Sequence, residues 1–412
     1  SLEHYIKVCG KQFSKLLSSQ QVQAEADRVW CGVERCLFGN GKELHFKKLM
    51  DFDTIGGKSN KNGARFDLDA MYVNWLGLSL KCYLPKSENS LSYVWESLKG
   101  KISYCNIKRL MFSSGWRYYA EIVVSGAAPT RVSIGTSTMG IDPGVSTIAG
   151  VSEDACVLEE LAPNAIQYEK KIQKISQRMD RSRRISNPNK YNEDGTINRS
   201  NRDPWKYSKN YVKMCRLLKS LYRKKHAYIV DSHRKLCNKL ITIARYFPVE
   251  KMHFQALQKR AKETKRQEKK TEVKQKDGTV KVIQKYKRKK RFGRSINRRA
   301  PARFLLELKR KAEAVGGVYA EVDTKEFKAS QYNHVTDTYE KIPLSQREKE
   351  IGNRKVQRDL YSAFLIRNAD LDFKHPDREK CEYEFEYFAD MQDQLILKMK
   401  ESGLSMRQCF GF

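Results

Sequence analysis

The 412-residue sequence predicts an α/β protein with a small antiparallel β-domain and helical segments, and three observations support this fold class. Alternating apolar and polar residues in Leu76–Leu84 and Trp116–Val124 indicate half-buried strands within a small barrel or sandwich. From Thr138 onward, short apolar stretches alternate with long segments of helical periodicity. Residues 1–38 come before both and also show helical spacing. We therefore expect a helical segment, an antiparallel barrel and a larger α/β domain, in that order.

The larger domain is predicted to contain five strands separated by helices. The strands are expected at Thr138–Asp142, Ser146–Val151, Cys156–Leu161, Tyr246–Glu250 and Gly317–Asp323. Leucines at helical spacing between Met214 and Leu240 predict long helices, and the polar segment Asn187–Pro204 predicts the loop between helices. A final helix is expected from about Arg358. This order of strands and helices is typical of an RNase H-like core.

The charge balance indicates a polyanionic partner. The sequence has 80 Lys and Arg against 48 Asp and Glu, which gives a formal net charge of +32. Such an excess opposes compaction unless a polyanion neutralises it, and nucleic acid is the usual polyanion. An anionic membrane is the rival partner, but no long amphipathic basic helix and no apolar run of about 18–20 residues is present. We therefore expect nucleic acid as a partner and no membrane.

The ten cysteines predict a cytoplasmic protein with reduced thiols. None of them forms a C-x-x-C pair, and their spacing shows no disulfide framework. The closest pair, Cys31 and Cys36, fits two core positions better than half of a zinc site. No signal peptide is visible at the N-terminus, where the sequence begins at Ser1 and not at a methionine.

Two basic segments are candidates for contact with a phosphate backbone. Residues 262–291 are dense in Lys and Arg and are predicted to leave the core as part helix and part hairpin, with a turn at Lys276–Thr279. A solvated charge run is the alternative, but the proximity to Glu250 in the sequence favours phosphate contact. The loop Gly56–Ser59 lacks the upstream glycine of a Walker loop, because Phe52 occupies that position. We expect a basic turn there.

Three carboxylates lie where such a core would place catalytic groups. Asp142 ends the first strand, Glu250 ends a later strand, and Asp359 begins the predicted last helix. Phosphodiester hydrolysis by two Mg²⁺ ions about 3.5–4 Å apart needs hard oxygen ligands, and clustered carboxylates repel one another without metal. A turn residue, a strand end and a helix cap are the alternatives for each residue alone. Their order favours a catalytic site with Mg²⁺, or Mn²⁺ as a substitute.

Three motifs around these carboxylates resemble the TnpB (OrfB) family of transposon-encoded RNA-guided nucleases and the compact type V CRISPR effectors derived from it. The motifs are Gly140–Ser146, Val249–Met252 with Leu257–Lys262, and Gln357–Ala363. Phe292–Ile296, Ala300-Pro301 and Gly57–Asn60 also resemble family sequence. The resemblance covers most of the chain, and it implies a RuvC-type nuclease that is directed by a guide RNA.

The family architecture implies a role for each part of the chain. Residues 1–38 resemble the end of a helical recognition lobe, 39–127 the wedge barrel that binds guide RNA, 128–323 the RuvC domain with the basic insertion 262–291, 324–356 a target-binding insertion, and 357–412 the C-terminal part of RuvC. The implied partners are a guide RNA, of transposon or CRISPR type, and double-stranded target DNA with a short adjacent motif. The implied location is the prokaryotic cytoplasm, on the nucleoid when bound to a target.

One departure from the family pattern concerns zinc. Family members usually carry a zinc ribbon with two C-x-x-C pairs just before the third motif, whereas Lys328–Arg358 contains no cysteine. A single histidine, His334, cannot make a four-ligand zinc site. We therefore predict that the chain binds no zinc, and that an insertion without metal takes the place of the zinc ribbon.

Several contacts and functions remain open at this point. The predicted nucleic-acid contacts are Lys58, Gln258, Lys259, Arg260, Lys287, Arg288 and Arg358. Arg358 fits either a contact to the scissile phosphate or a surface salt bridge. The leading function is an RNA-guided DNA endonuclease. The alternatives are an RNA-guided DNA-binding module that does not cut, and a structure-selective nuclease such as a junction resolvase, although the latter are usually smaller and lack a wedge barrel.

Overall fold

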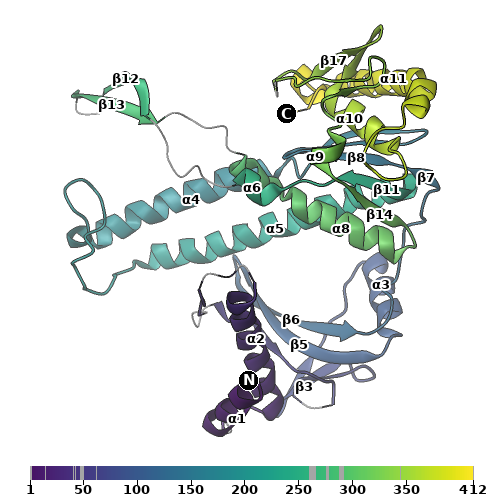
Figure 1. Ribbon diagram of the computed structural model, residues 1–412. Helices are drawn as coiled ribbons and strands as arrows, with labels where there is room; N and C mark the ends of the chain where they lie inside the picture. Colours follow the sequence, from purple (N-terminus) through teal and green to yellow (C-terminus); the bar gives the residue numbers. More distant parts are fainter. Residues whose placement is uncertain are drawn as a thin grey trace. The chain divides into compact units, whose positions relative to one another are not determined.

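The computed structural model describes residues 2–411 apart from 14, 40, 42, 47–50, 62, 259–265, 275–277, 287–291 and 344. The chain divides into two compact units (Figure 1). The first unit comprises Ser1–Pro129 and Ile172–Arg223, and the second comprises Thr130–Lys171 and Lys224–Phe412. No helix within the described ranges is long and apolar enough to cross a membrane.

The first unit begins with the two helices that the periodicity of residues 1–38 predicts. Helix α1 spans Leu2–Phe13 and helix α2 spans Ser19–Leu37. The side chain of Ser18 accepts a hydrogen bond from the backbone N–H of Gln21, and the side chain of Gln21 accepts one from the N–H of Ser18. This capping box satisfies two N–H groups that a helix start would otherwise leave unpaired.

Two three-stranded antiparallel sheets follow. The first has the order β1 (Thr54–Gly56), β5 (Ile102–Phe112), β6 (Gly115–Val124), and the second has the order β2 (Arg65–Asp67), β3 (Tyr72–Trp75), β4 (Leu78–Lys81). Helix α3 spans Glu88–Leu98. One hydrophobic cluster joins residues of both sheets and of α3, including Phe66, Val73, Leu98 and Cys105. The predicted antiparallel strands are confirmed, and their closure into a barrel stays a prediction.

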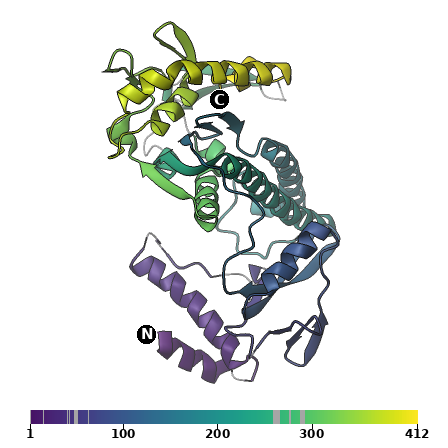
Figure 2. The ribbon, with the colours of Figure 1, turned by 90° about the vertical axis from the view of Figure 1, so that its right-hand side faces the viewer.

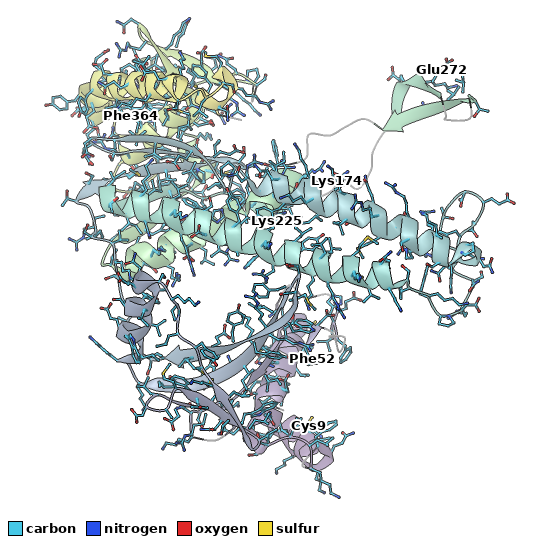
Figure 3. The ribbon with its side chains drawn as sticks, turned by 180° about the vertical axis from the view of Figure 1, so that it is seen from behind. Cys9, Phe52, Lys174, Lys225, Glu272 and Phe364 are labelled. Carbon is cyan, nitrogen blue, oxygen red and sulfur yellow. The ribbon has the colours of Figure 1, made fainter. Side chains whose placement is uncertain are left out.

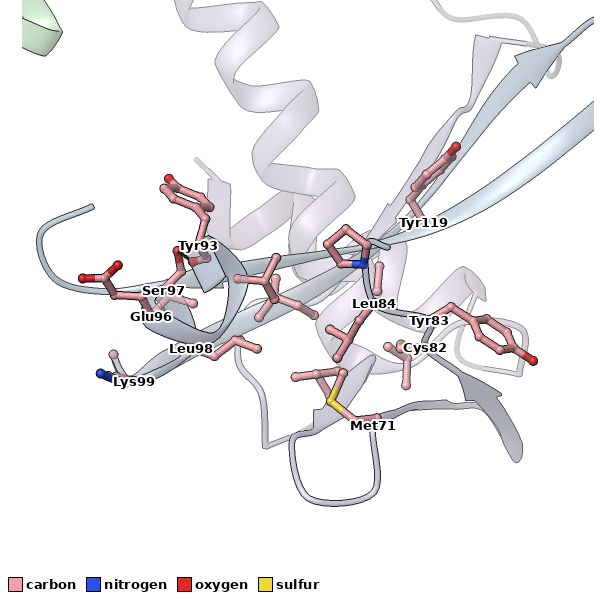
Figure 4. A pocket seen from close by; sticks show the side chains of 18 of the residues that line it. Met71, Cys82, Tyr83, Leu84, Tyr93, Glu96, Ser97, Leu98, Lys99 and Tyr119 are labelled. Carbon is pink, nitrogen blue, oxygen red and sulfur yellow. Dashed lines mark hydrogen bonds between the residues drawn. The ribbon is translucent and has the colours of Figure 1, made fainter. Parts of the chain in front are cut away.

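The strand predicted over Leu76–Leu84 is confirmed only for Leu78–Lys81, and the prediction that it is half-buried is wrong. Leu76 has a φ of 47° and Gly77 a φ of 79°, so these residues form the turn between β3 and β4. All four residues of β4 are exposed. Leu80 and the residues after it line an open pocket of about 1170 Å³, whose other walls come from α3 and β6 (Figure 4). Of the alternating apolar residues, only Leu80, Cys82 and Leu84 line this pocket, and Leu76 and Leu78 are exposed outside it.

The second unit is built on a mixed sheet with the strand order β10-β9-β8-β11-β14. The strands span Cys156–Glu160 (β10), Thr147–Val151 (β9), Gly140–Pro143 (β8), Ala244–Glu250 (β11) and Val318–Val322 (β14), and a short strand β7 (Ser137–Thr138) pairs with β11. β8, β9 and β10 form an antiparallel meander, while β11 is parallel to both β8 and β14. All five predicted strands are confirmed, with boundaries that differ by one or two residues.

Helices cover both faces of this sheet (Figures 1 and 2). Helices α10 (Arg358–Arg367) and α11 (Arg378–Glu401) pack on one face, in a cluster that includes Ala149, Val151 and Val322. Helices α5 (Lys209–Ile243) and α8 (Pro301–Ala314) pack on the other face, against Ile141 and Val249. Because successive residues of a strand point to opposite faces, the neighbours of Ile141 and Val249 face α10.

The remaining elements connect this sheet. They are α4 (Ala165–Ser186), the 3-10 helix Pro188–Lys190, α6 (Phe254–Gln258), β12 (Arg266–Lys274), β13 (Val280–Tyr286), α7 (Gly293–Arg299), α9 (Thr324–Phe327), β15 (Tyr332–Asn333), β16 (Thr338–Tyr339), β17 (Glu348–Ile351), β18 (Arg354–Gln357) and α12 (Met406–Cys409). β12 and β13 pair antiparallel, so the hairpin predicted within residues 262–291 is confirmed. Residues 276–277 of its predicted turn lie outside the described residues, and the described residues of this segment contain no helix where part of it was predicted to be helical.

A helix begins at Arg358 as predicted, but the expectation that it is the last helix is wrong, because α11 and α12 follow α10. Phe364 of α10 stacks on Phe388 of α11 with ring centroids 4.6 Å apart (Figure 3 labels Phe364). The cysteine-free segment before α10 forms two hairpins, β15–β16 and β17–β18. Its His334 is buried beside Tyr361 and Phe385, with Nδ1 2.8 Å from the Tyr361 hydroxyl. Aromatic packing and this hydrogen bond hold the segment on α10.

Because two histidines are buried, we expect the protein to lose stability in mild acid. Burial lowers the pKa of His233 and of His334 from 6.5 to about 4. The unfolded chain therefore binds more protons than the folded chain between these values, so stability falls as the pH drops through this window. His233 packs edge-on against Phe304, near Arg303 and Glu307. Each histidine contributes about 2 kcal/mol of this loss at pH 5.

His233→Phe is expected to reduce the loss of thermal stability between pH 7 and pH 5, because phenylalanine keeps the apolar packing and takes up no proton. Scanning calorimetry at both pH values measures this loss. His45→Gln is the matched control, because the His45 side chain is 82% exposed. An equal loss in His233→Phe and in the wild type would contradict the prediction.

Candidate active site

Two of the three predicted carboxylates lie side by side on adjacent strands. β11 and β8 pair parallel, with Val249 opposite Ile141. One residue further along both strands, Glu250 and Asp142 are therefore neighbours at about the 4.8 Å spacing of paired strands. Since Ile141 and Val249 belong to the core under α5 and α8, the two carboxylates point to the face that α10 covers.

The third carboxylate reaches the same face from a helix. Asp359 lies in the first turn of α10, which packs against β8 and β9. The buried Gln357 precedes the helix, and its side-chain oxygen accepts a hydrogen bond from the backbone N–H of Leu360 at 2.5 Å. This cap fixes where α10 begins and therefore the position of Asp359. The N-terminus of a helix also stabilises a negative charge.

The pKa values of Asp142 and Glu250 respond to burial and to the negative charge of Asp359. Burial raises the pKa of Asp142 well above its ordinary range, and the negative charges of Glu250 and Asp359 and a hydrogen bond with Glu250 raise it further. Burial and the charge of Asp359 also raise the pKa of Glu250. Without a cation, the pair is therefore more stable when it carries a proton. Carboxylates in this state favour a bound cation that replaces the proton.

Two arginines form ion pairs with the carboxylate of Asp359. Arg358 Nη2 lies 2.9 Å from Asp359 Oδ1, and Arg347 Nη1 lies 3.4 Å from Asp359 Oδ2. Arg358 is only 8% exposed and also donates to the carbonyl of Gln346, so it is not a surface salt bridge. In the part of the chain that the structure describes, no three acidic, histidine or cysteine side chains are arranged to hold one metal ion as they stand. Asp142 and Glu250 are paired, whereas Asp359 is held by cations.

The segment after α12 also reaches this site. Gln357 Nε2 donates to the carbonyl oxygen of Phe410 at 2.9 Å, and it lies 3.4 Å from Asp359 Oδ2. A Cβ atom at Gly411 would lie 3.3 Å from Asp359 Oδ2. Sequence reasoning missed Arg347, Gln357 and this segment as neighbours of Asp359. Only the capping position of Gln357 gives a local signal, and glutamine is not a typical N-cap residue.

The other predicted contact residues have varied surroundings. Lys58 forms an ion pair with Asp27, with Nζ 2.6 Å from Oδ2, and its backbone N–H donates to the side chain of Gln20. Gln258 is the exposed last residue of α6. Lys259, Arg260, Lys287 and Arg288 lie outside the described residues. Contact of these residues with nucleic acid stays a prediction.

The carboxylate pair fits a hard divalent cation. Asp142 and Glu250 offer oxygen ligands, which Mg²⁺ and Mn²⁺ prefer. Burial, and then the neighbouring negative charge, raise the pKa values of both carboxyls, and a bound cation would offset both effects. Asp359 would join them when its carboxylate leaves Arg358 and Arg347. Such a site supplies Lewis-acid polarisation of a phosphate and a nucleophilic water.

Comparison with known proteins gives a likeness of fold. The sequence matches no established family profile and no curated protein sequence. Among solved structures, the chain is similar to one in "Cryo-EM structure of the Cas12f1-sgRNA-target DNA complex", with 12% identity, a TM-score of 0.51, and coverage of 89% of this chain and 75% of that chain. A chain in "Cryo-EM structure of CRISPR-Cas12f Ternary Complex" is 14% identical, with a TM-score of 0.32 and coverage of 89% and 74%.

Proposed function

We propose that the protein is an RNA-guided DNA endonuclease of the compact type V effector class, with an RNase H-like RuvC site that hydrolyses DNA phosphodiesters with Mg²⁺. The observation that carries this proposal is the pairing of Asp142 and Glu250 on adjacent parallel strands, with Asp359 at the start of the helix that covers them. The mixed sheet with the order β10-β9-β8-β11-β14 supports the RNase H-like fold. The likeness to a Cas12f1 chain in a complex with sgRNA and target DNA supports the partners.

The chain's own groups divide the chemistry between them. Asp142 and Glu250 would hold the divalent cations, whose positive charge would stabilise both carboxylates in their ionised form. Asp359 would complete the ligand set from the N-terminus of α10. Arg358 and Arg347, once released from Asp359, lie beside the place of the scissile phosphate and offset its negative charge. A water molecule attacks the phosphorus and no covalent intermediate forms with the protein.

The remaining parts of the chain take the roles that the resemblance implies. We assign the guide RNA to the two sheets of the first unit within residues 39–127, and the end of a recognition lobe to α1 and α2. The hairpins β15–β16 and β17–β18 fill the place of the zinc ribbon. Their buried His334 and Tyr332 supply packing in place of metal ligands. A transposon or CRISPR origin of the guide is compatible with this assignment, and the expected location is the prokaryotic cytoplasm.

Cleavage of plasmid DNA tests this function. Protein purified with its native RNA is expected to cut a matching plasmid in Mg²⁺ and not in EDTA, and Glu250→Ala is expected to bind RNA and DNA without cutting. Glu321→Ala is the matched control, because Glu321 lies on the adjacent strand β14 and pairs with Lys251 at 3.0 Å. Cutting by Glu250→Ala at the wild-type rate would refute the site.

A guided DNA-binding protein that does not cut is the second candidate. The observation in its favour is the state of Asp359, whose two oxygens are engaged by Arg358 and Arg347. If this arrangement persists in Mg²⁺, the third ligand is never free. In that case wild-type protein would hold target DNA and leave it intact in the same plasmid experiment.

A further inference from the structure

A helical hairpin in the first unit carries a large excess of positive charge. We define the hairpin tip as residues 172–223, which comprise most of α4, the loop 187–208 and the first part of α5. The tip contains 14 Lys and Arg against 4 Asp and Glu. Figure 3 labels one of these cations, Lys174, on α4. None of the predicted catalytic or contact residues lies in this segment.

The loop of the hairpin tip is ordered by its own side chains. The buried Asn187 donates to the carbonyls of Arg183 and Lys206 at 2.8 Å each, and its side-chain oxygen accepts from the N–H of Lys206 at 2.7 Å. Lys190 is 5% exposed and donates to the carbonyl of Asn201. Loops of this length are uncommon in compact proteins and usually functional. The network fixes the loop in one conformation.

Six of the cations on this scaffold have no polar partner among the described residues. Arg178, Arg181, Arg199, Arg202, Lys213 and Arg216 are exposed, and they form no hydrogen bond or ion pair with any residue that the structure describes. The acid Asp180 is already paired with Arg183 and Arg184. Like charges held together on a rigid scaffold repel one another, and a polyanion would offset this repulsion.

An aromatic face accompanies these charges. Tyr207 stacks on Tyr211 with ring centroids 4.6 Å apart, and Tyr207 is 51% exposed. Unpaired bases at the end or in the loop of an RNA stem stack on such rings, whereas lipid headgroups and acidic peptides do not need them. Unpaired cations and an exposed aromatic ring in the same segment therefore favour a nucleic acid over other polyanions.

We propose that the hairpin tip is a docking element for the phosphate backbone of duplex RNA. We assign this duplex RNA to a stem of the guide RNA, and this assignment rests on the proposed function. The reason is that the cations of the tip repel one another even when no target DNA is bound. A guide RNA that stays bound between targets offsets this repulsion at all times, whereas target DNA offsets it only while it is bound. Contact to the backbone is independent of sequence.

Binding of a 20-base-pair RNA duplex of arbitrary sequence tests the proposal without any need for cleavage. The variant Arg199→Gln/Arg202→Gln/Lys213→Gln is expected to bind at least about tenfold more weakly at 150 mM salt, and its slope of log K against log[salt] is expected to be shallower by about 2–3. Lys374→Gln/Lys398→Gln/Lys400→Gln removes the same charge from exposed positions elsewhere and is expected to leave the slope near the wild-type value. Equal slopes in both triple variants would overturn the proposal.

A second measurement identifies the source of the nucleic acid. Protein purified with its native RNA is washed with rising salt, and the tip variant is expected to lose RNA at lower salt than the wild type and the control. Full retention of RNA, together with weaker binding of target DNA by the loaded protein, would overturn the assignment to guide RNA. Thermal unfolding checks that the variants fold, which is expected because the replaced side chains are exposed and form no hydrogen bond or ion pair with a described residue. Absence of DNA cleavage would refute the nuclease and leave these RNA measurements valid.

Discussion

Replacement of Asp142 by asparagine is expected to abolish DNA cleavage and to make the metal-free protein more stable. The Asp142 carboxylate is buried beside Glu250 and near Asp359, and its raised pKa shows that the folded chain resists its negative charge. Asparagine has nearly the same shape and no charge. We expect cleavage to fall by at least about 10³-fold and the melting temperature in EDTA to rise by roughly 2–4 °C.

The pH dependence of this effect has a defined sign. The pKa of the Asp142 carboxyl is higher in the folded chain than in the unfolded chain. Above the pKa of the unfolded chain, the unfolded carboxyl ionises more readily than the folded one, so the free energy of unfolding falls as the pH rises. Asparagine does not ionise. The stability difference between Asp142→Asn and the wild type is therefore expected to grow from pH 5 to pH 8.

Calorimetry with and without Mg²⁺ separates the two effects of the substitution. Mg²⁺ is expected to raise the melting temperature of the wild type, because it binds only the folded chain, and to have little effect on Asp142→Asn. Asp372→Asn is the matched control, since Asp372 is an exposed carboxylate in the loop before α11. A variant that is less stable than the wild type in EDTA, or that still cuts, would contradict the assignment of Asp142.

The sheet and the pairing of two candidate catalytic residues were predictable from sequence because both depend on local patterns. Short apolar runs ending at Asp142 and Glu250 predict strands with polar ends, and the order of the strands predicts which ends meet. The parallel pairing of Val249 with Ile141 confirms that these ends adjoin. Strand order and strand-end chemistry are therefore enough to bring these two carboxylates together.

The environment of Asp359 was not predictable in the same way. Arg347 and Gly411 lie 12 and 52 positions from Asp359 in the chain, and no periodicity links residues across a hairpin or a terminal segment. The burial of strand β4 was predicted wrongly for a related reason. Alternation of apolar and polar residues indicates which face of a strand is apolar, but not whether another element covers that face. Tertiary contacts decide both features.

Gly140→Ala is expected to disrupt the fold of the second unit and with it the site. A Cβ atom at Gly140 would lie 2.2 Å from the carbonyl oxygen of Ala363 and 2.3 Å from the backbone nitrogen of Arg367, both in α10. Real Cβ atoms do not approach backbone atoms this closely, so α10 would have to move away from β8. We expect a loss of about 3 kcal/mol or more in the free energy of unfolding by urea.

The displacement of α10 would also separate the carboxylates, because α10 carries Asp359 and β8 carries Asp142 only two residues beyond Gly140. Cleavage is therefore expected to be lost even where Gly140→Ala stays folded. Gly150→Ala on β9 is the matched control, since its Cβ would lie 3.1 Å from the sulfur of Met139, a flexible side chain that can yield. If Gly140→Ala were as stable and as active as Gly150→Ala, the close contact of α10 with β8 would not determine the geometry of the site.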